Sequence, residues 1–209
     1  LVICGEGKAI LGEKEMPGKA AMAAVGITPI VPIEKEGLAL INGTHLMSSI
    51  AALSLADIAV ICETAVISTA MSIDAAKGTI TFLDDRIHTA RGQSGQRTVA
   101  SSIREHLRGS TILTSHGEGD PRVQDPYSIR CSPQVLGAAI EAISRITSVI
   151  SAELGAVTDN PLVFPEDNEI LSGGNFHGMP LAIALDELRL SLCHIAGIAE
   201  RRIEWILSE

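Results

Sequence analysis

The sequence predicts an all-α fold, a bundle of long helices joined by short irregular or hairpin segments. Apolar residues make up 46% of the chain, yet only five residues are aromatic, so the core must be built from Ala, Ile, Leu and Val. Residues 44 to 77 also contain neither proline nor glycine. An aliphatic composition and a long uninterrupted run are typical of packed helices, because strands favour aromatic and β-branched residues.

The chain length fits one domain over residues 1–209. The chain begins at Leu1 without a methionine, and the amphipathic run ERRIEWILSE at its end contains no helix stop signal. We therefore expect the central helical-bundle fragment of a longer protein. The first residues lack the basic segment of a signal peptide.

Residues 1 to 37 are broken by glycines and three prolines, and we expect the end of one helix followed by short irregular connections. The run from Thr44 to Lys77 predicts a helix roughly 50 Å long, ended by Gly78. Because this helix is apolar on most sides, we expect it to be buried on most sides in a bundle shared between subunits. Serines and Asp57 interrupt the run and no aromatic belt flanks it, so we expect no membrane span.

Three further helical segments follow. Ser94 is expected to cap a helix over 95–108 that ends at Gly109. Ser132 and Pro133 start a helix that continues through Leu154. A strand or hairpin is expected over 162–171, and a final helix from Pro180 onward.

The helix over 132–154 carries a predicted bundle seam, since apolar residues recur at steps of three and four with Thr147 in the one polar position. The seam consists of Leu136, Ile140, Ile143, Ile150 and Leu154. Glu141 and Arg145 are spaced as an i,i+4 ion pair on a solvated face.

Charge and cysteine usage exclude several classes of function. The net charge is −9, and no basic cluster interleaves with aromatic residues, so we expect no nucleic-acid partner. The four cysteines are far apart and form no CxxC pair, which indicates reduced thiols in a cytoplasmic protein. The six histidines are equally scattered, so we expect no metal site.

The stretch VQDPYSIRCSPQ at 123–134 contains the only tyrosine of the chain. Asp125 and Pro126 have the pattern of an N-cap followed by Pro at the first helical position, and Pro133 limits the turn to about six residues. Gln124, Tyr127 and Arg130 step by three, so a helical turn presents an amide, a phenol and a guanidinium on one side. Arg can bind a carboxylate through two bonds and Tyr can relay a proton. The alternative is a loop that Arg130 pins by binding backbone carbonyls.

Two other segments are candidates for a site. Asn42 lies in LALINGTHL just before the long helix, where Asn-Gly is also typical of a plain turn. In SGGNFHG at 172–178, three glycines permit close approach of the backbone to a ligand that Phe176 and His177 would face.

Five ordered segments together resemble the aromatic amino-acid ammonia-lyases, and among them the histidine enzymes most closely. The segments are EGLALINGT (36–44), VQDPYSIRCSPQVLGA (123–138), TDNPLVF (158–164), SGGNFHG (172–178) and ERRI (200–203). The related phenylalanine enzymes typically carry Lys-Gln-Asp-Arg-Tyr and Asn-Phe-Gln-Gly where this chain has Val-Gln-Asp-Pro-Tyr and Asn-Phe-His-Gly. This difference favours L-histidine as substrate and trans-urocanate and ammonia as products, the first step of histidine degradation.

The resemblance implies a role for each candidate residue. The β-proton of an amino acid is far less acidic than any group a side chain ordinarily deprotonates, and the family supplies an electrophile, a methylidene-imidazolone (MIO) made from an internal Ala-Ser-Gly. Arg130 would hold the substrate carboxylate, with Asn42 and Gln124 hydrogen-bonding near it and near the electrophile. Tyr127 would assist proton movement, and Phe176 would pack against the ring.

The chain departs from the family in containing no Ala-Ser-Gly. The resemblance therefore implies that the parent protein is the enzyme, with no external cofactor, and that the isolated chain is inactive. It also implies a cytoplasmic homotetramer, with the MIO on a missing segment or a companion fragment. Two alternatives stay open: a phenylalanine or tyrosine ammonia-lyase or aminomutase of the same family, and a non-catalytic helical oligomerisation scaffold.

Overall fold

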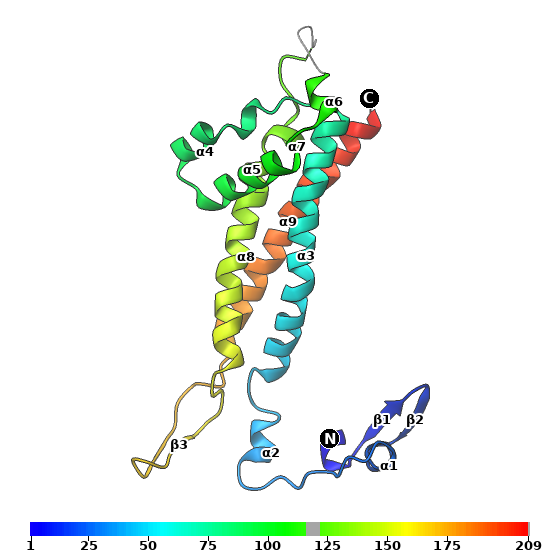
Figure 1. Ribbon diagram of the computed structural model, residues 1–209. Helices are drawn as coiled ribbons and strands as arrows, with labels where there is room; N and C mark the ends of the chain where they lie inside the picture. Colours follow the sequence, from blue (N-terminus) through cyan, green and yellow to red (C-terminus); the bar gives the residue numbers. More distant parts are fainter. Residues whose placement is uncertain (116–121, 209) are drawn as a thin grey trace. The chain divides into compact units, whose positions relative to one another are not determined.

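A computed structural model describes residues 1–115 and 122–208, and the chain in it divides into two compact units (Figure 1). The first unit contains residues 1–43 and 157–177, and the second contains residues 44–156 and 178–209. The single domain expected over 1–209 stays a prediction.

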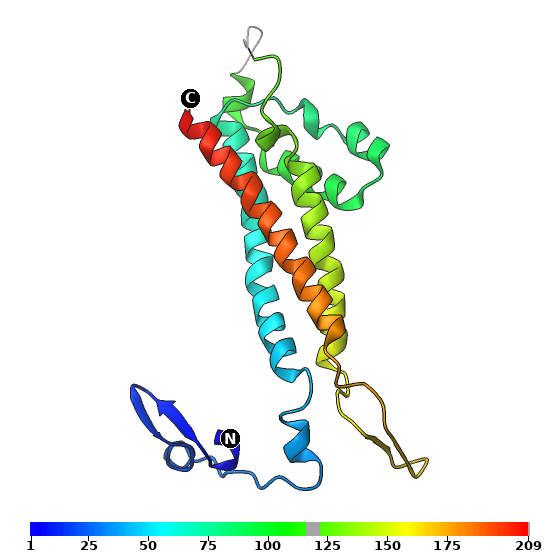
Figure 2. The same ribbon diagram turned by 180° about the vertical axis from the view of Figure 1, so that it is seen from behind.

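Three long helices form the second unit: α3 (His45–Ala75), α8 (Ser132–Leu154) and α9 (Met179–Ser208). They run side by side in both views (Figures 1 and 2). The structure confirms the predicted all-α class. Helices α3 and α8 begin and end within two residues of the predicted bounds, and α9 begins one residue before the predicted start at Pro180. Thr44, the N-cap residue of α3, donates its hydroxyl to Glu153 Oε1 at 2.6 Å, which joins the start of α3 to the end of α8.

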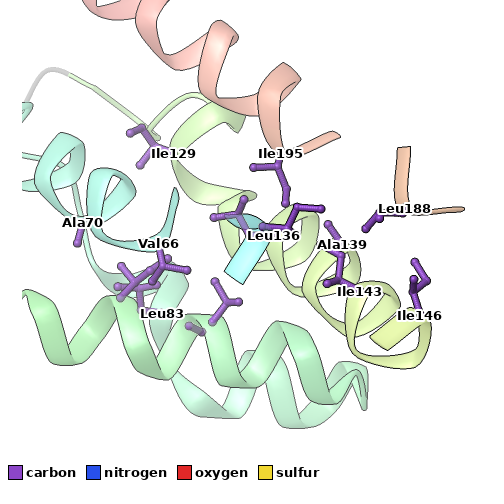
Figure 3. Packing of buried hydrophobic residues seen from close by; sticks show 14 of the residues in the cluster. Val66, Ala70, Leu83, Ile129, Leu136, Ala139, Ile143, Ile146, Leu188 and Ile195 are labelled. Atoms are coloured by element: carbon purple, nitrogen blue, oxygen red, sulfur yellow. The ribbon is translucent and has the colours of Figure 1, made fainter. Parts of the chain in front are cut away.

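The facing surfaces of α8 and α9 carry buried residues at alternating steps of three and four, as in a coiled-coil seam. On α8 the stripe comprises Ser132, Leu136, Ala139, Ile143, Ile146 and Ile150. The predicted seam was therefore correct at three positions, whereas Ala139 and Ile146 take the places expected for Ile140 and Thr147. Ile140 is half-buried and packs against the edge of the core. Leu154 is 56% exposed. Figure 3 shows several of these side chains converging with Leu188 and Ile195 of α9.

Helix α3 is buried along one stripe only. Its buried residues are Ser48, Ala51, Ile58, Val66, Thr69, Ala70 and Ile73. Within this chain α3 packs on the bundle along one face and leaves large apolar side chains such as Leu46, Leu53 and Val60 exposed. Burial of its other sides in a bundle shared between subunits stays a prediction. Its hydroxyl groups are satisfied locally: Ser48, Thr69 and Ser72 each donate to a carbonyl one turn back.

In the described residues, α3 and α8 are the two helices long and apolar enough to cross a membrane by length and composition alone. The buried core helices of soluble proteins have the same features. The absence of a membrane partner stays a prediction.

Shorter helices gather near one end of the bundle. They are η2 (Thr81–Leu83), α4 (Asp85–Arg91), α5 (Ser94–His106), α6 (Thr111–Thr114) and α7 (Tyr127–Arg130). Helix α5 crosses α8 at Gly95 and Gly137, where a Cβ on Gly137 would lie 2.4 Å from the Gln96 backbone. The predicted cap of α5 was wrong, because Gln93 is the N-cap residue and the Ser94 hydroxyl donates to Glu141 Oε1 at 2.8 Å.

Glu141 completes the N-terminus of α5 from outside the helix. Its Oε2 accepts from the Gly95 amide at 3.2 Å, and these hydrogen bonds lower the pKa of Glu141. Arg145, predicted to pair with Glu141, instead binds Glu187 of α9 at 2.6 Å. Glu141 and Arg145 therefore do not form the predicted i,i+4 ion pair, because both side chains reach across to other helices.

The first unit contains two antiparallel hairpins, β1 (Lys8–Leu11) with β2 (Lys14–Pro17) and β3 (Leu162–Phe164) with β4 (Glu169–Leu171). The second was predicted. The first was missed, although a signal for it was present. Gly12 has a positive φ of 63°, and a glycine at such a position is typical of a two-residue hairpin loop. The other elements are η1 (Val2–Cys4), α1 (Gly18–Ala24) and α2 (Glu36–Ala39).

Candidate active site around Tyr127 and Arg130

The candidate site is built on α7, a helix of four residues that begins after Pro126 and leads through Cys131 into α8. The predicted N-cap was wrong. Pro126 is itself the N-cap residue, and Asp125 Oδ2 accepts from the backbone amide and the hydroxyl of Thr79, both at 2.8 Å. Asp125 therefore anchors the segment to the residues that follow α3.

Tyr127 and Arg130 are brought together by α7. The guanidinium carbon of Arg130 lies 4.7 Å from the centroid of the Tyr127 ring, which is cation–π geometry. Tyr127 is 72% exposed, so its hydroxyl is open to a ligand. Arg130 Nε is buried and has no hydrogen-bond partner in the structure.

The free Nε weighs against the alternative that Arg130 is a structural pin. Among residues 1–115 and 122–208, no hydrogen bond joins Arg130 to a backbone carbonyl and no carboxylate pairs with it. A buried N–H without a partner is costly. The arrangement fits a guanidinium whose Nε–H gains its hydrogen-bond acceptor when an anionic ligand binds.

The remaining predicted site residues are not assembled with this pair by any described contact. Gln124 is exposed and precedes α7, so only Tyr127 and Arg130 share the helical turn. Asn42 and Phe176 belong to the first unit. Asn42 donates its backbone amide to Leu38 at 2.8 Å in the turn after α2, and Phe176 is 40% exposed. The roles of these residues stay predictions.

The glycine-rich segment at 172–178 is held to the preceding 157–160 turn by two asparagines, Asn160 in the turn and Asn175 in the segment. The Gly173 amide donates to Asn160 Oδ1 at 2.7 Å, and Asn175 Nδ2 donates to the Val157 carbonyl at 3.4 Å. Lys35 forms an ion pair with Asp159 at 2.8 Å, and its hydrogen bond lowers the pKa of that carboxyl. The TDNP turn is thus tied to both the glycine segment and the chain before α2.

A groove of about 620 Å³ borders the Tyr127 ring between α7, the first turn of α8 and α9. Its lining includes Cys131, Val135, His194, Ile198 and Trp205. All four cysteines of the chain are free thiols, as predicted. In the described part of the chain, no group of three His, Cys, Asp or Glu side chains has the geometry of a metal site.

Two residues close to α7 in the chain or in the fold were not predicted as part of the site. Gln134, one turn after Arg130, has a buried Oε1 with no partner. Arg202 of α9 is 4% exposed and contacts α7. A signal for Arg202 was present, because it continues the three-and-four spacing of apolar residues from Leu181 along α9.

Comparison with known proteins identifies the fold. The family model for aromatic amino acid lyases matches residues 1–209. Histidine ammonia-lyases of Alkaliphilus oremlandii and Treponema denticola are each 45% identical over 208 residues, which is 100% of this chain and 41% and 40% of theirs. The chain therefore spans about two-fifths of the length of these curated relatives.

Solved structures agree. The histidine ammonia-lyase of Trypanosoma cruzi matches 97% of this chain and 38% of its own, with a TM-score of 0.84 and 38% identity. The phenylalanine aminomutase of Pantoea agglomerans matches 98% of this chain and 43% of its own, with a TM-score of 0.88 and 31% identity. The chain belongs to the aromatic amino acid lyase family.

Proposed function

We propose that this chain is the carboxylate-binding part of a histidine ammonia-lyase, an enzyme that converts L-histidine to trans-urocanate and ammonia. The observation that carries the proposal is the buried, unpartnered Nε–H of Arg130 beside the open phenol of Tyr127. The choice of histidine rests on the curated relatives that are 45% identical over the whole chain.

Arg130 binds the carboxylate of the amino acid, since its guanidinium meets no carboxylate of the described chain and can offer two parallel donors. Stacking on the Tyr127 ring limits the directions in which the guanidinium can point. Gln124 is exposed beside the start of α7 and supplies an amide near the same carboxylate. Tyr127 Oη moves a proton to or from the substrate.

The MIO of this family supplies the electrophile that makes loss of the amino group and β-proton possible. The chain contains no Ala-Ser-Gly, so another segment must bring the group. The residues present fit such a group, because the ring of Tyr127 is 72% exposed and leaves aromatic surface for it. Asn42 would hydrogen-bond to it and Phe176 would pack against it.

The assembly is part of the proposal. The exposed side of α3 carries large apolar residues, among them Leu46, Leu53 and Val60, and a contiguous exposed apolar patch marks a surface that another protein covers. We propose that further protein covers it in a cytoplasmic homotetramer, with the electrophile on a segment outside this chain or on a companion fragment. The isolated 209-residue chain is then inactive.

The test uses the full-length protein and the isolated chain in parallel. Each is incubated with L-histidine, and product is measured by mass spectrometry and by the absorbance of urocanate. We expect urocanate and ammonia from the full-length protein only. Lack of urocanate from the full-length protein would refute the function, and turnover by the isolated chain would refute its inactivity.

A phenylalanine or tyrosine lyase or aminomutase is the second candidate, favoured by the TM-score of 0.88 to the Pantoea aminomutase. The same incubations with L-phenylalanine and L-tyrosine separate the two. A cinnamate-type product or a β-amino acid in place of urocanate would move the assignment to this candidate.

A further inference from the structure

Arg202 is a buried charge at a position where the sequence pattern calls for an apolar residue. It is 4% exposed and lies on the stripe of α9 that packs into the bundle. In the described residues no carboxylate forms an ion pair with it, and burial lowers the pKa of its guanidinium. Removing a cation from water without a counter-charge is costly, so a well-packed apolar residue would ordinarily stabilise such a site more.

Within the described chain, the hydrogen bonds of Arg202 go to α7, which carries the candidate site, and to the first residue of α8. Its Nε donates to the carbonyl of Ser128 in α7, and its Nη2 donates to the hydroxyl of Ser132, both at 3.2 Å. Ser132 Oγ in turn donates to the same Ser128 carbonyl at 2.9 Å. The guanidinium thus joins α9 to α7 and to the first residue of α8.

The geometry of α7 explains why this contact matters. A helix of four residues has hardly any internal hydrogen bonds, and its carbonyls need partners from outside. Ser128 lies between Tyr127 and Arg130, and its carbonyl is oriented by Arg202. A cation near the carbonyl end of a helix is also electrostatically favourable.

We propose that Arg202 is a positioning residue: it fixes α7 so that the guanidinium of Arg130 and the ring of Tyr127 keep the relation that binds the substrate carboxylate. The inference rests on the proposed function. Arg202 touches neither of the two side chains in any described contact, and it acts through the backbone of Ser128.

The test replaces Arg202 in the full-length protein. Arg202→Met removes the donors and keeps most of the stem, and Arg202→Lys keeps the charge and one donor. Arg189→Met is the matched control, because Arg189 lies on the same helix and its side chain is 82% exposed. The readout is inhibition by two histidine analogues, imidazole-propionate, which keeps the carboxylate, and histamine, which lacks it.

We expect Arg202→Met to weaken inhibition by imidazole-propionate about tenfold or more. The substitution removes the hydrogen bonds from the guanidinium that hold α7, and Arg130 on α7 is then less well positioned for the carboxylate. Inhibition by histamine should change by no more than about twofold, and Arg202→Lys should recover part of the loss. Equal weakening for both analogues, or none for either, would overturn the inference. The control variant should resemble the unsubstituted enzyme.

A second readout needs no substrate. Hydrogen exchange followed by mass spectrometry on the peptide that spans residues 127–132 should be about tenfold faster or more in Arg202→Met, while exchange in α5 stays unchanged. Unchanged exchange in this peptide would also overturn the inference. If the unsubstituted protein does not convert L-histidine, the proposed function fails, and the exchange result still decides whether Arg202 holds α7.

Discussion

Gly137→Ala is expected to separate α5 from α8. The added Cβ would lie 2.4 Å from the Cα and the amide nitrogen of Gln96, and these are backbone atoms that cannot rotate away. An ordinary carbon contact is about 3.5–4.0 Å, so the helices must move apart by roughly 1 Å. The Gly95 amide is already 3.2 Å from Glu141 Oε2, and that movement would break the bond.

The expected cost follows from these changes. Overpacking costs about 1–3 kcal/mol, and a lost hydrogen bond to a charged group costs about 1.5–3 kcal/mol. The higher helix propensity of alanine offsets at most about 1 kcal/mol of this cost. The net loss in the free energy of unfolding is therefore about 2–5 kcal/mol, measured by urea titration with far-ultraviolet circular dichroism.

Gly155→Ala is the matched control, because Gly155 ends the same helix and an added Cβ would meet no atom within 4 Å. Its effect should stay within about 0.5 kcal/mol. If Gly137→Ala destabilises the protein no more than this control does, α5 and α8 do not pack as closely at Gly137 as the structure shows.

Three further changes test the core, a buried histidine and the site. Ile146→Ala, at a side chain 1% exposed in the α8 seam, should lower the free energy of unfolding by about 2–5 kcal/mol; a loss under 1 kcal/mol by urea titration would contradict that packing. His88 is buried, with its Nδ1 2.9 Å from Gln96 Nε2, and burial lowers the pKa of its imidazole. The unfolded chain then binds the proton more readily, so the free energy of unfolding should fall as the pH drops below about 6.5. His88→Gln should remove that part of the pH dependence, and an unchanged slope in pH-dependent urea titrations would refute it. Arg130→Met in the full-length protein should lower kcat/KM for L-histidine roughly 100- to 1000-fold, with Arg130→Lys recovering only part; parity with the unsubstituted enzyme in a urocanate assay would exclude carboxylate binding by Arg130.

Helix positions were predictable where a long run of the sequence showed one consistent pattern and its ends carried local start or stop signals. The absence of proline and glycine over 44–77 and the Ser-Pro start at 132 set the ends of α3 and α8 nearly correctly. Details that depend on neighbouring helices were not predictable. Ser94 has the chemistry of an N-cap, but Glu141 from α8 supplies a stronger acceptor, and no local pattern shows that the two will meet.

The candidate site was predictable in its chemistry and only partly in its geometry. The spacing of Tyr127 and Arg130 placed both on one helical turn, and the structure brings them together. The same spacing put Gln124 on that turn, which the actual start of α7 after Pro126 prevents. Arg202 was part of the ERRI segment that carries the resemblance, but no role was assigned to it, although its position in the repeat indicated burial.

The uncovered side of α3 has a consequence during synthesis. Its partners α8 and α9 lie far downstream, with the last turn of α9 ending at Ser208. At roughly 5–20 residues per second, a ribosome takes on the order of 10 s to make the chain between the end of α3 and that point. Until α5 and α8 are made, the whole apolar surface of α3 is exposed on the nascent chain, and the part that contacts α9 stays exposed to the end of this interval. Yield in a cell should therefore depend on chaperones that shield this helix until its partners emerge.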